Sequence, residues 1–511
     1  MRPVTCTAVT GSCNRSSLLL LAALAACSGK KKDEEPPAPK PAPTLPEPTG
    51  PVKPRAPLAT DDSEHSGKLV WARAFGGEGR DEAKAVDIDA DGNVAVAGIF
   101  TGEVDFGAGK FTSKDTSGFV GVLGPDGKPK WMAPLSAHLP KKDAGDVTVA
   151  DVTVSGVTFD GKGNLAVVGW FSNVLEVGDL GVKAKGADDA FVAVFDKTGK
   201  PQWVKALGGD NTDIAWGVAA APDGGLAVIG ERRGAADFGG GEFEAKGSAD
   251  IWLVRLNADG DHLWSRSWGD MGEDNGRAVV FDSRGDVIIA VEMDLPLDFG
   301  DGKPLPHKGK GDVAIVKLST VGNLRWARSF GNTFDDVVLG LAVDGADEVI
   351  FSGSFEDKLK IGNDKLTAGE RADAYVAKLD PEGNPLWARS WGGQWEDMAA
   401  GVGADKFGNI VVTGWFQGTV DFGGGPQEAP NGNMDGFLMK LAPDGKHLWS
   451  RRFGDKDHDR GRAVAVAPAG DIALGGIFRF TLDLGGETLR SSTKTGDKIA
   501  PADAFFARFG P

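Results

Sequence analysis

Cysteine is almost absent from this 511-residue chain, and its three copies, Cys6, Cys13 and Cys27, all lie near the N-terminus. The remainder of the chain therefore has no disulfide, no cysteine-ligated zinc site and no cysteine nucleophile. Positive charge is also in short supply, because 56 Lys and Arg residues face 73 Asp and Glu residues, for a formal net charge of −17. An acidic chain of this kind lacks the basic surface that phosphate backbones require, so no nucleic-acid partner is predicted.

Glycine, in contrast, is abundant, with 75 copies against a single tyrosine. Glycine in this amount, without a Gly-X-Y period, is typical of many tight turns and therefore of many short strands. Catalytic signatures such as HExxH, the nucleophile elbow and the P-loop are missing from the sequence. The composition thus favours a β-rich protein whose chemistry does not rest on a local motif.

The N-terminus carries an export signal. Leu18–Ala26 is an apolar run too short to span a bilayer, as expected for the core of a signal peptide. The run ends in Leu24-Ala25-Ala26-Cys27, which resembles the lipobox of bacterial lipoproteins. The resemblance implies a signal peptide over residues 1–26, cleavage before Cys27 and lipid attachment to its thiol. The expected location is the bacterial outer membrane, with the lipid-anchored chain facing the periplasm or the cell surface.

A tether follows the lipidated cysteine over residues 27–66. It begins with the charged run Lys30–Glu35 and continues with ten prolines between Pro36 and Pro57. Proline at this density favours extended polyproline II, at about 3.1 Å per residue, and does not build a core. We therefore predict a disordered spacer that holds the following domain away from the membrane.

One heptapeptide pattern recurs along the rest of the chain. Trp387-Ala388-Arg389-Ser390-Trp391-Gly392-Gly393 is one copy, and Trp71–Gly77 is another. The other copies open at Trp131, where the pattern is degenerate, and at Trp203, Trp264, Trp326 and Trp449. These tryptophans are spaced by 60 to 72 residues, a period that is typical of repeat architectures, in which each unit packs on its neighbours.

Each repeat contains four strand-length segments. After Trp203 they are Gly217–Ala221, Leu226–Gly230, Asp250–Leu256 and Leu263–Trp268, separated by Gly, Asp and Asn turns and without helical spacing. The last repeat lacks a fourth segment, and Lys68–Phe75 is such a segment without the first three. We therefore predict an all-β fold over residues 67–511: a seven-bladed β-propeller of four-stranded antiparallel blades, closed by an N-terminal strand that completes the last blade.

Three motifs resemble a known family. They are the Trp387 heptapeptide, the segment Val420-Asp421-Phe422-Gly423-Gly424-Gly425, and the segment Asp373-Ala374-Tyr375-Val376-Ala377-Lys378-Leu379-Asp380. Together they resemble the bacterial β-propeller repeats called SBBP, over residues 67–511. The resemblance implies a propeller-repeat lipoprotein and carries no catalytic residue. The unit at Trp131 departs from the pattern through about eleven extra residues, Ser136 to Asp146.

No cofactor and no metal site is predicted. The segment Asp87–Gly92 imitates the start of a calcium loop, but Gly98 stands where the glutamate at the twelfth position would be needed. Asp196, Gly199 and Trp203 resemble the docking motif of quinoprotein propellers, which has one more residue between the aspartate and the glycine. The docking tryptophan is structural even in those proteins, so the pattern does not predict a quinone site.

An aspartate lies ten residues after most of the repeated tryptophans. These ring aspartates are Asp81, Asp213, Asp274, Asp336, Asp397 and Asp459, and Asp151 is the predicted equivalent in the unit with the insertion. Each precedes the innermost strand of a blade, so the fold would place them around the mouth of the channel. They could bind a cation or a polar ligand, or they could serve as turn carboxylates that accept backbone N–H groups.

The residues just before each ring aspartate differ from copy to copy, on what should be one face of the propeller. A constant frame with variable tips is how scaffolds present binding residues. The ligand-binding candidates are therefore Arg80, Asn211, Phe334, Trp395 and His458, together with the ring aspartates. The insertion Ser136–Asp146, with His138, would stand on the same face.

The sequence therefore leads to three functional hypotheses. The first is a monomeric, lipid-anchored cell-envelope propeller that binds a protein or a glycan through its loop face, without enzymatic activity. The second is a scaffold in envelope assembly, with the membrane as a partner through the N-terminal lipid. The third is a polysaccharide hydrolase or lyase that uses carboxylates at the channel mouth, such as Asp213 and Asp397.

Overall fold

Short apolar runs bounded by glycine turns form strands throughout the computed structural model, which describes residues 67–138, 150–492 and 501–511. These described residues belong to the unit Pro41–Pro511, whereas the unit Met1–Lys40 lies outside them. Within this range there is no α-helix, and one short 3₁₀ turn, η1 (Pro430–Gly432), is present. Accordingly, no described helix is long and apolar enough to cross a membrane.

The strands follow the order predicted from the repeats, and four classes recur. The inner strands are β2 (Glu82–Ile88), β6 (Val152–Phe159), β10 (Asp213–Ala220), β16 (Asn275–Phe281), β20 (Asp336–Val343), β26 (Met398–Ala404) and β32 (Arg460–Val466). The second strands are β3 (Val94–Asp105), β7 (Leu165–Val177), β11 (Leu226–Arg232), β17 (Val287–Met293), β21 (Val349–Phe355), β27 (Ile410–Gln417) and β33 (Ile472–Phe478). The third strands are β4 (Lys110–Leu123), β8 (Leu180–Phe195), β14 (Asp250–Leu256), β18 (Asp312–Leu318), β24 (Asp373–Leu379), β30 (Met434–Leu441) and β36 (Asp503–Phe509). The outer strands, which carry the repeated tryptophans, are β1 (Leu69–Phe75), β5 (Pro129–His138), β9 (Pro201–Gly209), β15 (His262–Trp268), β19 (Leu324–Phe330), β25 (Pro385–Trp391) and β31 (His447–Phe453).

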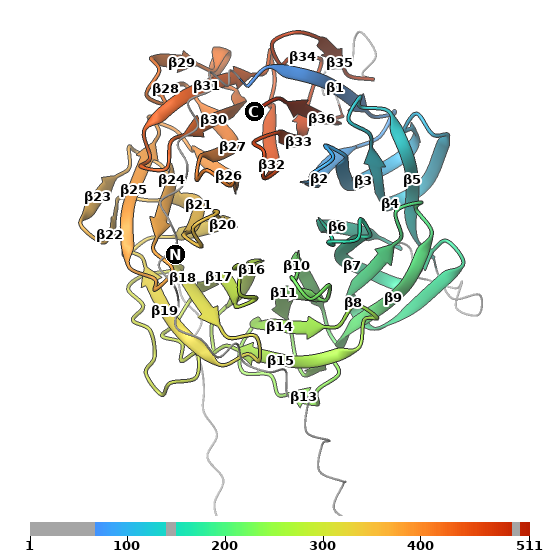
Figure 1. The fold of residues 1–511 in the computed structure, drawn as a ribbon, viewed down its shortest axis with the longest axis vertical. Helices are drawn as coiled ribbons and strands as arrows, with labels where there is room; N and C mark the ends of the chain where they lie inside the picture. Colours follow the sequence, from blue (N-terminus) through green and yellow to red (C-terminus); the bar gives the residue numbers. More distant parts are fainter. Residues whose placement is uncertain (1–66, 139–149, 493–500) are drawn as a thin grey trace, which may run out of the picture. The chain divides into compact units, whose positions relative to one another are not determined.

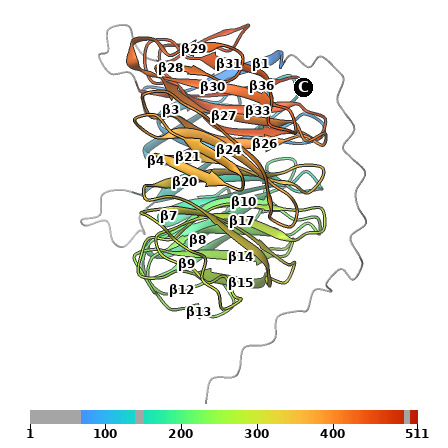
Figure 2. The same cartoon turned by 90° about the vertical axis from the view of Figure 1, so that its left-hand side faces the viewer.

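These strands pair in antiparallel sheets that surround a common centre, with the inner strands nearest to it (Figure 1). Seen from the side, neighbouring sheets form stacked layers (Figure 2). The order in one sheet is β10-β11-β14-β15, and the same order recurs in the sheets that begin at β16, β20 and β26. Inner strands of successive sheets contact each other, and β2 also contacts β32. The all-β, propeller-type arrangement predicted from the sequence is therefore confirmed.

The last sheet combines the two ends of the described chain, in the order β1-β36-β33-β32. Strand β1 pairs antiparallel with β36 from Leu69 opposite Phe509 to Phe75 opposite Ala504. The first two groups of strands are joined differently, because Ser136, Ala137 and His138 of β5 pair with β7. These three residues open the predicted insertion, whose residues 139–146 lie outside the described part of the chain.

Short hairpins cover the outer parts of several sheets. They are β12 (Ala236–Asp237) with β13 (Glu242–Phe243), β22 (Lys358–Ile361) with β23 (Asp364–Thr367), β28 (Thr419–Asp421) with β29 (Pro426–Glu428), and β34 (Thr481–Asp483) with β35 (Thr488–Arg490). The Asp-Phe-Gly segments next to them fill the core. Phe238 stacks on Trp252 of β14 with 4.6 Å between ring centroids, and Phe422 lies 4.7 Å from Phe437 of β30.

The repeated tryptophan fastens each repeat to the next one. Trp326 donates its indole N–H to the carbonyl of Pro381 (2.9 Å), and its ring lies directly against Gly383 in the same turn. Gly383 has a φ of +80°, and a Cβ there would meet the indole at 2.7 Å, so both geometry and space favour glycine. Arg328, two residues after the tryptophan, lies over the same ring at 5.8 Å. The Trp and Arg residues of the Trp-Ala-Arg motif thus pack one repeat against the next.

The same contact recurs around the structure. The pairs are Trp71 with Gly127, Trp131 with Gly199, Trp203 with Gly260, Trp264 with Gly322, Trp387 with Gly445, and Trp449 with Gly67. The last pair links an outer strand near the C-terminal end to the first described residue.

Basic residues in the third strands form buried ion pairs that the sequence analysis missed. Lys317 Nζ lies 2.8 Å from Asp282, and Lys378 Nζ lies 2.8 Å from Asp344, with both lysine side chains only 1% exposed. Arg255, Lys440 and Arg508 pair in the same way with Asp223, Asp405 and Asp471. The signal was a basic residue at the penultimate position of each of these strands. Such pairs favour one arrangement of the third strand and the turn that carries the aspartate, since removing one member leaves an uncompensated buried charge.

Candidate functional site

The predicted ligand residues lie in loops that lead from the outer strand of one sheet into the inner strand of the next. Because each loop enters an inner strand at the same end, the loops share one face of the propeller, which we call the loop face. Arg80 and Asn211 are exposed on this face, Phe334 is 41% and Trp395 49% exposed, and His458 is half-buried. Large exposed aromatic side chains of this kind are what binding surfaces use as anchors.

The ring aspartates lie beneath these loops and are buried, with at most 1% of each residue exposed. Each uses one carboxylate oxygen to accept the backbone N–H of the residue four positions earlier. The donors are Gly77 for Asp81, Gly209 for Asp213, Asp270 for Asp274, Asn332 for Asp336, Gly393 for Asp397 and Asp455 for Asp459, at 2.7–3.0 Å. Of the two roles left open by the sequence, this geometry matches that of the turn carboxylate.

A second aspartate, which lies on a third strand, accompanies each ring aspartate. Asp189 lies beside Asp213, and a Cβ on Gly208 would stand 2.6 Å from one carboxylate and 3.0 Å from the other. The same pairing joins Asp503 to Asp81, Asp312 to Asp336, Asp373 to Asp397, and Asp435 to Asp459. Glycine at the end of the outer strand therefore leaves room for an acidic side chain, and Gly208 and Gly454 each lie against two.

Burial raises the pKa of the ring aspartates above the ordinary value of 3.8, and the neighbouring aspartate raises it further. The pKa reaches about 6 for Asp274, about 7 for Asp81, Asp213, Asp397 and Asp459, and about 8 for Asp336. Buried carboxyl groups with pKa values in this range are protonated in weakly acidic solution, and those with values of about 7 or 8 stay partly protonated at neutral pH. Within the described ranges, no group of three or more His, Cys, Asp or Glu side chains forms a metal cage.

The unit with the insertion breaks the pattern. Val152, and not the predicted Asp151, occupies the position of Asp213, because Val152 pairs with Phe171 two residues beyond Gly169, as Asp213 pairs with Arg232 two residues beyond Gly230. Asp151 instead accepts the N–H of Thr116 at 3.0 Å. The offset of one residue was invisible in the sequence, since the insertion removed the spacing from which the position was read.

Replacing Asp397 with alanine is expected to lower the free energy of unfolding by about 2–4 kcal/mol, because two backbone donors lose their acceptor. These donors are the N–H groups of Gly393 (2.9 Å) and Gln417 (3.0 Å). The matched variant Asp397→Asn keeps one acceptor oxygen and should cost less than half as much. Chemical denaturation measures both values. An Asp397→Ala protein as stable as the parent would contradict the turn role, and loss of ligand without loss of stability would assign Asp397 to the binding site.

Each inner strand carries a β-bulge at one point, where the pairing register skips a residue. The skipped residues are Lys84, Ser155, Trp216, Arg277, Leu339, Ala400 and Arg462. All are half-buried, and they differ from sheet to sheet in size and charge. A bulge re-aims a side chain and is frequent beside functional sites. The sequence analysis missed these positions, although they lie three residues after each ring position.

Two predicted ligand residues, Arg80 and His458, are brought together at a cavity of about 570 Å³ on the loop face. This arginine pocket, as we call it, is also lined by Arg460 and Arg462 of β32 and by Arg479 after β33. Asn211, Phe334 and Trp395 extend from other loops. Sequence analysis found Arg80 and His458 but missed the three further arginines.

Positive charge dominates the arginine pocket. Glu82, buried at its rim, forms ion pairs with Arg80 and with Lys84, the latter at 2.5 Å. Although burial opposes its charge, Lys84, Arg80 and Arg462 hold the pKa of Glu82 below its ordinary value. Burial, with the like charges around it, lowers the pKa of Lys84 and of Arg462. The arginine pocket is therefore a local cluster of positive charge in a protein whose net charge is negative.

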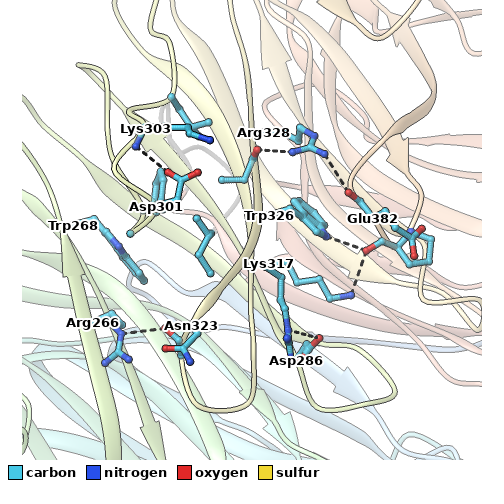
Figure 3. A pocket seen from close by; sticks show the side chains of 18 of the residues that line it. Arg266, Trp268, Asp286, Asp301, Lys303, Lys317, Asn323, Trp326, Arg328 and Glu382 are labelled. Atoms are coloured by element: carbon cyan, nitrogen blue, oxygen red, sulfur yellow. Dashed lines mark hydrogen bonds and ion pairs between the residues drawn. The ribbon is translucent and has the colours of Figure 1, made fainter. Parts of the chain in front are cut away.

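A second cavity, of about 1110 Å³, lies between the outer strands β15 and β19 (Figure 3). Its polar side chains are already engaged by turns of the neighbouring repeats. Arg266 donates to the carbonyl of Gly322 (3.1 Å), and Arg328 donates to the carbonyl of Glu382 (3.3 Å). The position of this groove and the hydrogen bonds of its two arginines therefore follow from the packing of one repeat against the next.

Comparison with known proteins gives a consistent but coarse result. No protein-family model matches the chain. The regulatory protein FlaEY of Caulobacter vibrioides is 28% identical over 199 residues, which cover 37% of this chain and 21% of that protein. An uncharacterised WD repeat-containing protein of Acanthamoeba polyphaga mimivirus is 25% identical over 203 residues, or 33% of this chain and 15% of that protein. The chain thus matches about a fifth or less of the length of these curated relatives.

Solved structures with a similar arrangement are distant in sequence. The WD40 domain of Neurospora crassa Pan2 is 11% identical with a TM-score of 0.42, covering 85% of this chain and 95% of that chain. The PQQ-bound aldose sugar dehydrogenase of Streptomyces coelicolor is also 11% identical, with a TM-score of 0.34 and coverage of 86% and 99%. The fold assignment therefore rests on the strand pairing of the chain itself, and that pairing identifies a repeat protein of the β-propeller type.

Proposed function

We propose that this chain is a lipid-anchored cell-envelope binding module: a seven-bladed β-propeller, closed by β1, that binds a ligand on its loop face. The closure is supported by the pairing of β1 with β36 and by the contact between β2 and β32. The anchor is supported by the lipobox-like Leu24-Ala25-Ala26-Cys27, and the spacer by the proline-rich residues that follow. Residues 1–66 lie outside the described part of the chain.

The observation that carries the binding role is the arginine pocket, which gathers side chains from the first and last repeats on the loop face. On other loops of the same face, the exposed Phe334 and Trp395 offer aromatic anchors on a rigid frame. A protein or a glycan is the proposed ligand, with the outer membrane as the second partner and a monomer as the working form. The alternative of polysaccharide cleavage is less well supported, because Asp213 and Asp397 are buried and bonded to backbone N–H groups.

Replacing Phe334 and Trp395 together with alanine is expected to weaken retention of the envelope ligand at least tenfold, or about 1.4 kcal/mol, because both rings are removed from the loop face. Leu386→Ala with Leu448→Ala is the matched control, since these side chains are 48% and 50% exposed on outer strands. The assay immobilises the full-length protein and measures the amount of envelope glycan and protein retained at graded concentrations. Equal retention by both double variants would mean that the loop face is not the binding surface.

A further inference from the structure

The arginine pocket is lined by four arginines, Arg80, Arg460, Arg462 and Arg479, but by only two carboxylates, Glu78 and Glu82. Arg80 and Lys84 share Glu82, and Arg479 pairs with Asp457 at 3.3 Å. Arg460 and Arg462 form no ion pair of this kind within the described residues, although Glu82 and Glu396 act on them at longer range. Arg460 donates to the sulfur of Met434. In a chain with a net charge of −17, two such arginines side by side need a separate explanation.

Three guanidinium groups in this pocket keep a buried donor without a partner. The Nε atoms of Arg460, Arg462 and Arg479 are enclosed and make no hydrogen bond among the described residues. A buried donor without a partner is costly, and a charged donor more so. Trp415 holds two of these groups in place, because the guanidinium carbons of Arg460 and Arg462 lie 5.0 and 5.4 Å from its ring. The guanidinium groups of Arg460 and Arg462 are thus held in a fixed orientation, and their Nε–H groups have no acceptor.

A planar guanidinium with free N–H groups is suited to an oxyanion, because its forked donors match the oxygens of carboxylate, sulfate and phosphate. An oxyanion bound here would accept from the guanidinium N–H groups that line the cavity and offset the repulsion between the arginines. The cavity in Figure 3 provides the contrast, since Arg266 and Arg328 there already donate to carbonyl oxygens. Of these two cavities, the arginine pocket is the one in which guanidinium N–H groups lack an acceptor among the described residues.

The size of the pocket and its surroundings indicate what carries the oxyanion. A volume of about 570 Å³ falls in the range of small-ligand pockets and exceeds what a single acidic side chain fills. Glu396 lies within electrostatic range of Arg460, and the preceding residue is Trp395, with 49% of its surface exposed. An exposed indole on the same loop face as a cationic cavity suits a ligand that has a ring with one apolar face and an acidic substituent.

We propose that the arginine pocket binds an oxyanion-bearing sugar residue of an acidic glycan, with Arg460, Arg462 and Arg479 as the donors to the oxyanion. This inference rests on the proposed ligand-binding function of the loop face and names the chemical class of the ligand. The substituent is a carboxylate, a sulfate or a phosphate, and the three sources are separated experimentally.

Calorimetry with the full-length protein tests the proposal. The probes are a galacturonate trimer, a sulfated galactose trimer, galactose 6-phosphate, a neutral galactose trimer, inorganic phosphate and a polyglutamate peptide. At least one acidic sugar is expected to bind at least tenfold more tightly than the neutral trimer, inorganic phosphate and polyglutamate. Arg462→Met should weaken that binding at least tenfold. Arg462→Lys, which keeps the charge but loses the fork, should retain part of it and guards against a variant that fails to fold.

The matched control is Arg325→Gln, which alters an arginine at the groove of Figure 3 and should leave binding unchanged. Tighter binding of polyglutamate than of every sugar would overturn the glycan class, and equal binding of inorganic phosphate would overturn the requirement for a sugar. If no acidic sugar binds while the parent protein still retains its envelope ligand through Phe334 and Trp395, this inference fails and the proposed function stands. If the envelope ligand is not retained either, the proposed function fails as well.

Discussion

Removing residues 67–75 is expected to prevent stable folding, or to lower the melting temperature by at least about 15 °C. These residues contain β1, which supplies the fourth strand of the last sheet. Their loss removes the buried Trp71, Ala72 and Phe75 from the core and leaves one edge of β36 without its partner. Two indole contacts also disappear, because Gly67 packs on Trp449 and Trp71 packs on Gly127. An open strand edge additionally promotes association between chains.

The control is a chain that begins at Gly67 and therefore lacks only the lipid anchor and the spacer. It should melt at the same temperature as the lipid-free chain with the spacer. Thermal melting by circular dichroism gives the stability, and size-exclusion chromatography gives the association state. If the chain without residues 67–75 melts like the control, the proposed closure by β1 is wrong.

Raising the pH from 5.5 to 8.5 is expected to lower the melting temperature by about 10 °C, through the ring aspartates. Their pKa values of about 6 to 8 in the folded protein exceed the ordinary 3.8 of the unfolded chain. The folded state therefore binds more protons between these values, and stability falls as the pH rises. Their contribution is fully present below about pH 4 and is lost as the pH passes through 6 to 8. Carboxylates with lowered pKa values, such as Asp282 and Asp223, oppose the effect only at lower pH.

The sharpest test uses Asp336, whose pKa is the highest of the ring at about 8. Asp336→Asn keeps the oxygen that accepts the N–H of Asn332 (2.7 Å) and cannot ionise. It should raise the melting temperature at pH 8.5 and change it little at pH 5.5. Asp421→Asn is the exposed control, because Asp421 lies exposed at the end of the short strand β28. A melting temperature that rises with pH in this window would contradict the assignment of protonated buried pairs.

Much of the fold was predictable because the repeats constrain it. The segment Asp250–Leu256 was predicted as a strand with the bounds that the structure gives to β14, since seven consecutive buried residues end at a glycine turn. The inner strand β10 begins at Asp213 and not at Gly217 as predicted. The error arose because Trp216 sits in a bulge, which breaks the alternation from which a strand is recognised.

The candidate site was predictable only in part. Arg80 and His458 stood out because they interrupt otherwise small and polar loops. Arg460, Arg462 and Arg479 did not, because a basic residue within or beside a short strand is ordinary until its neighbours are known. Their significance depends on Trp415 beneath them and on Glu82 from the other end of the chain. The depth of the ring aspartates was likewise undetermined, since a turn carboxylate and a ligand carboxylate have the same sequence signature.

The contact between each tryptophan and the glycine of the following turn has a consequence for how such a chain can change its length. The tryptophan lies at the end of one sheet, and its glycine lies in the turn that leads to the next outer strand. A stretch of chain from one tryptophan to the next therefore carries one half of a contact at each end. Duplicating or deleting that stretch restores every Trp–Gly pair and leaves the pairing of β1 with β36 untouched. Recombination between repeats can thus add or remove a complete unit without creating an unpaired junction in the core.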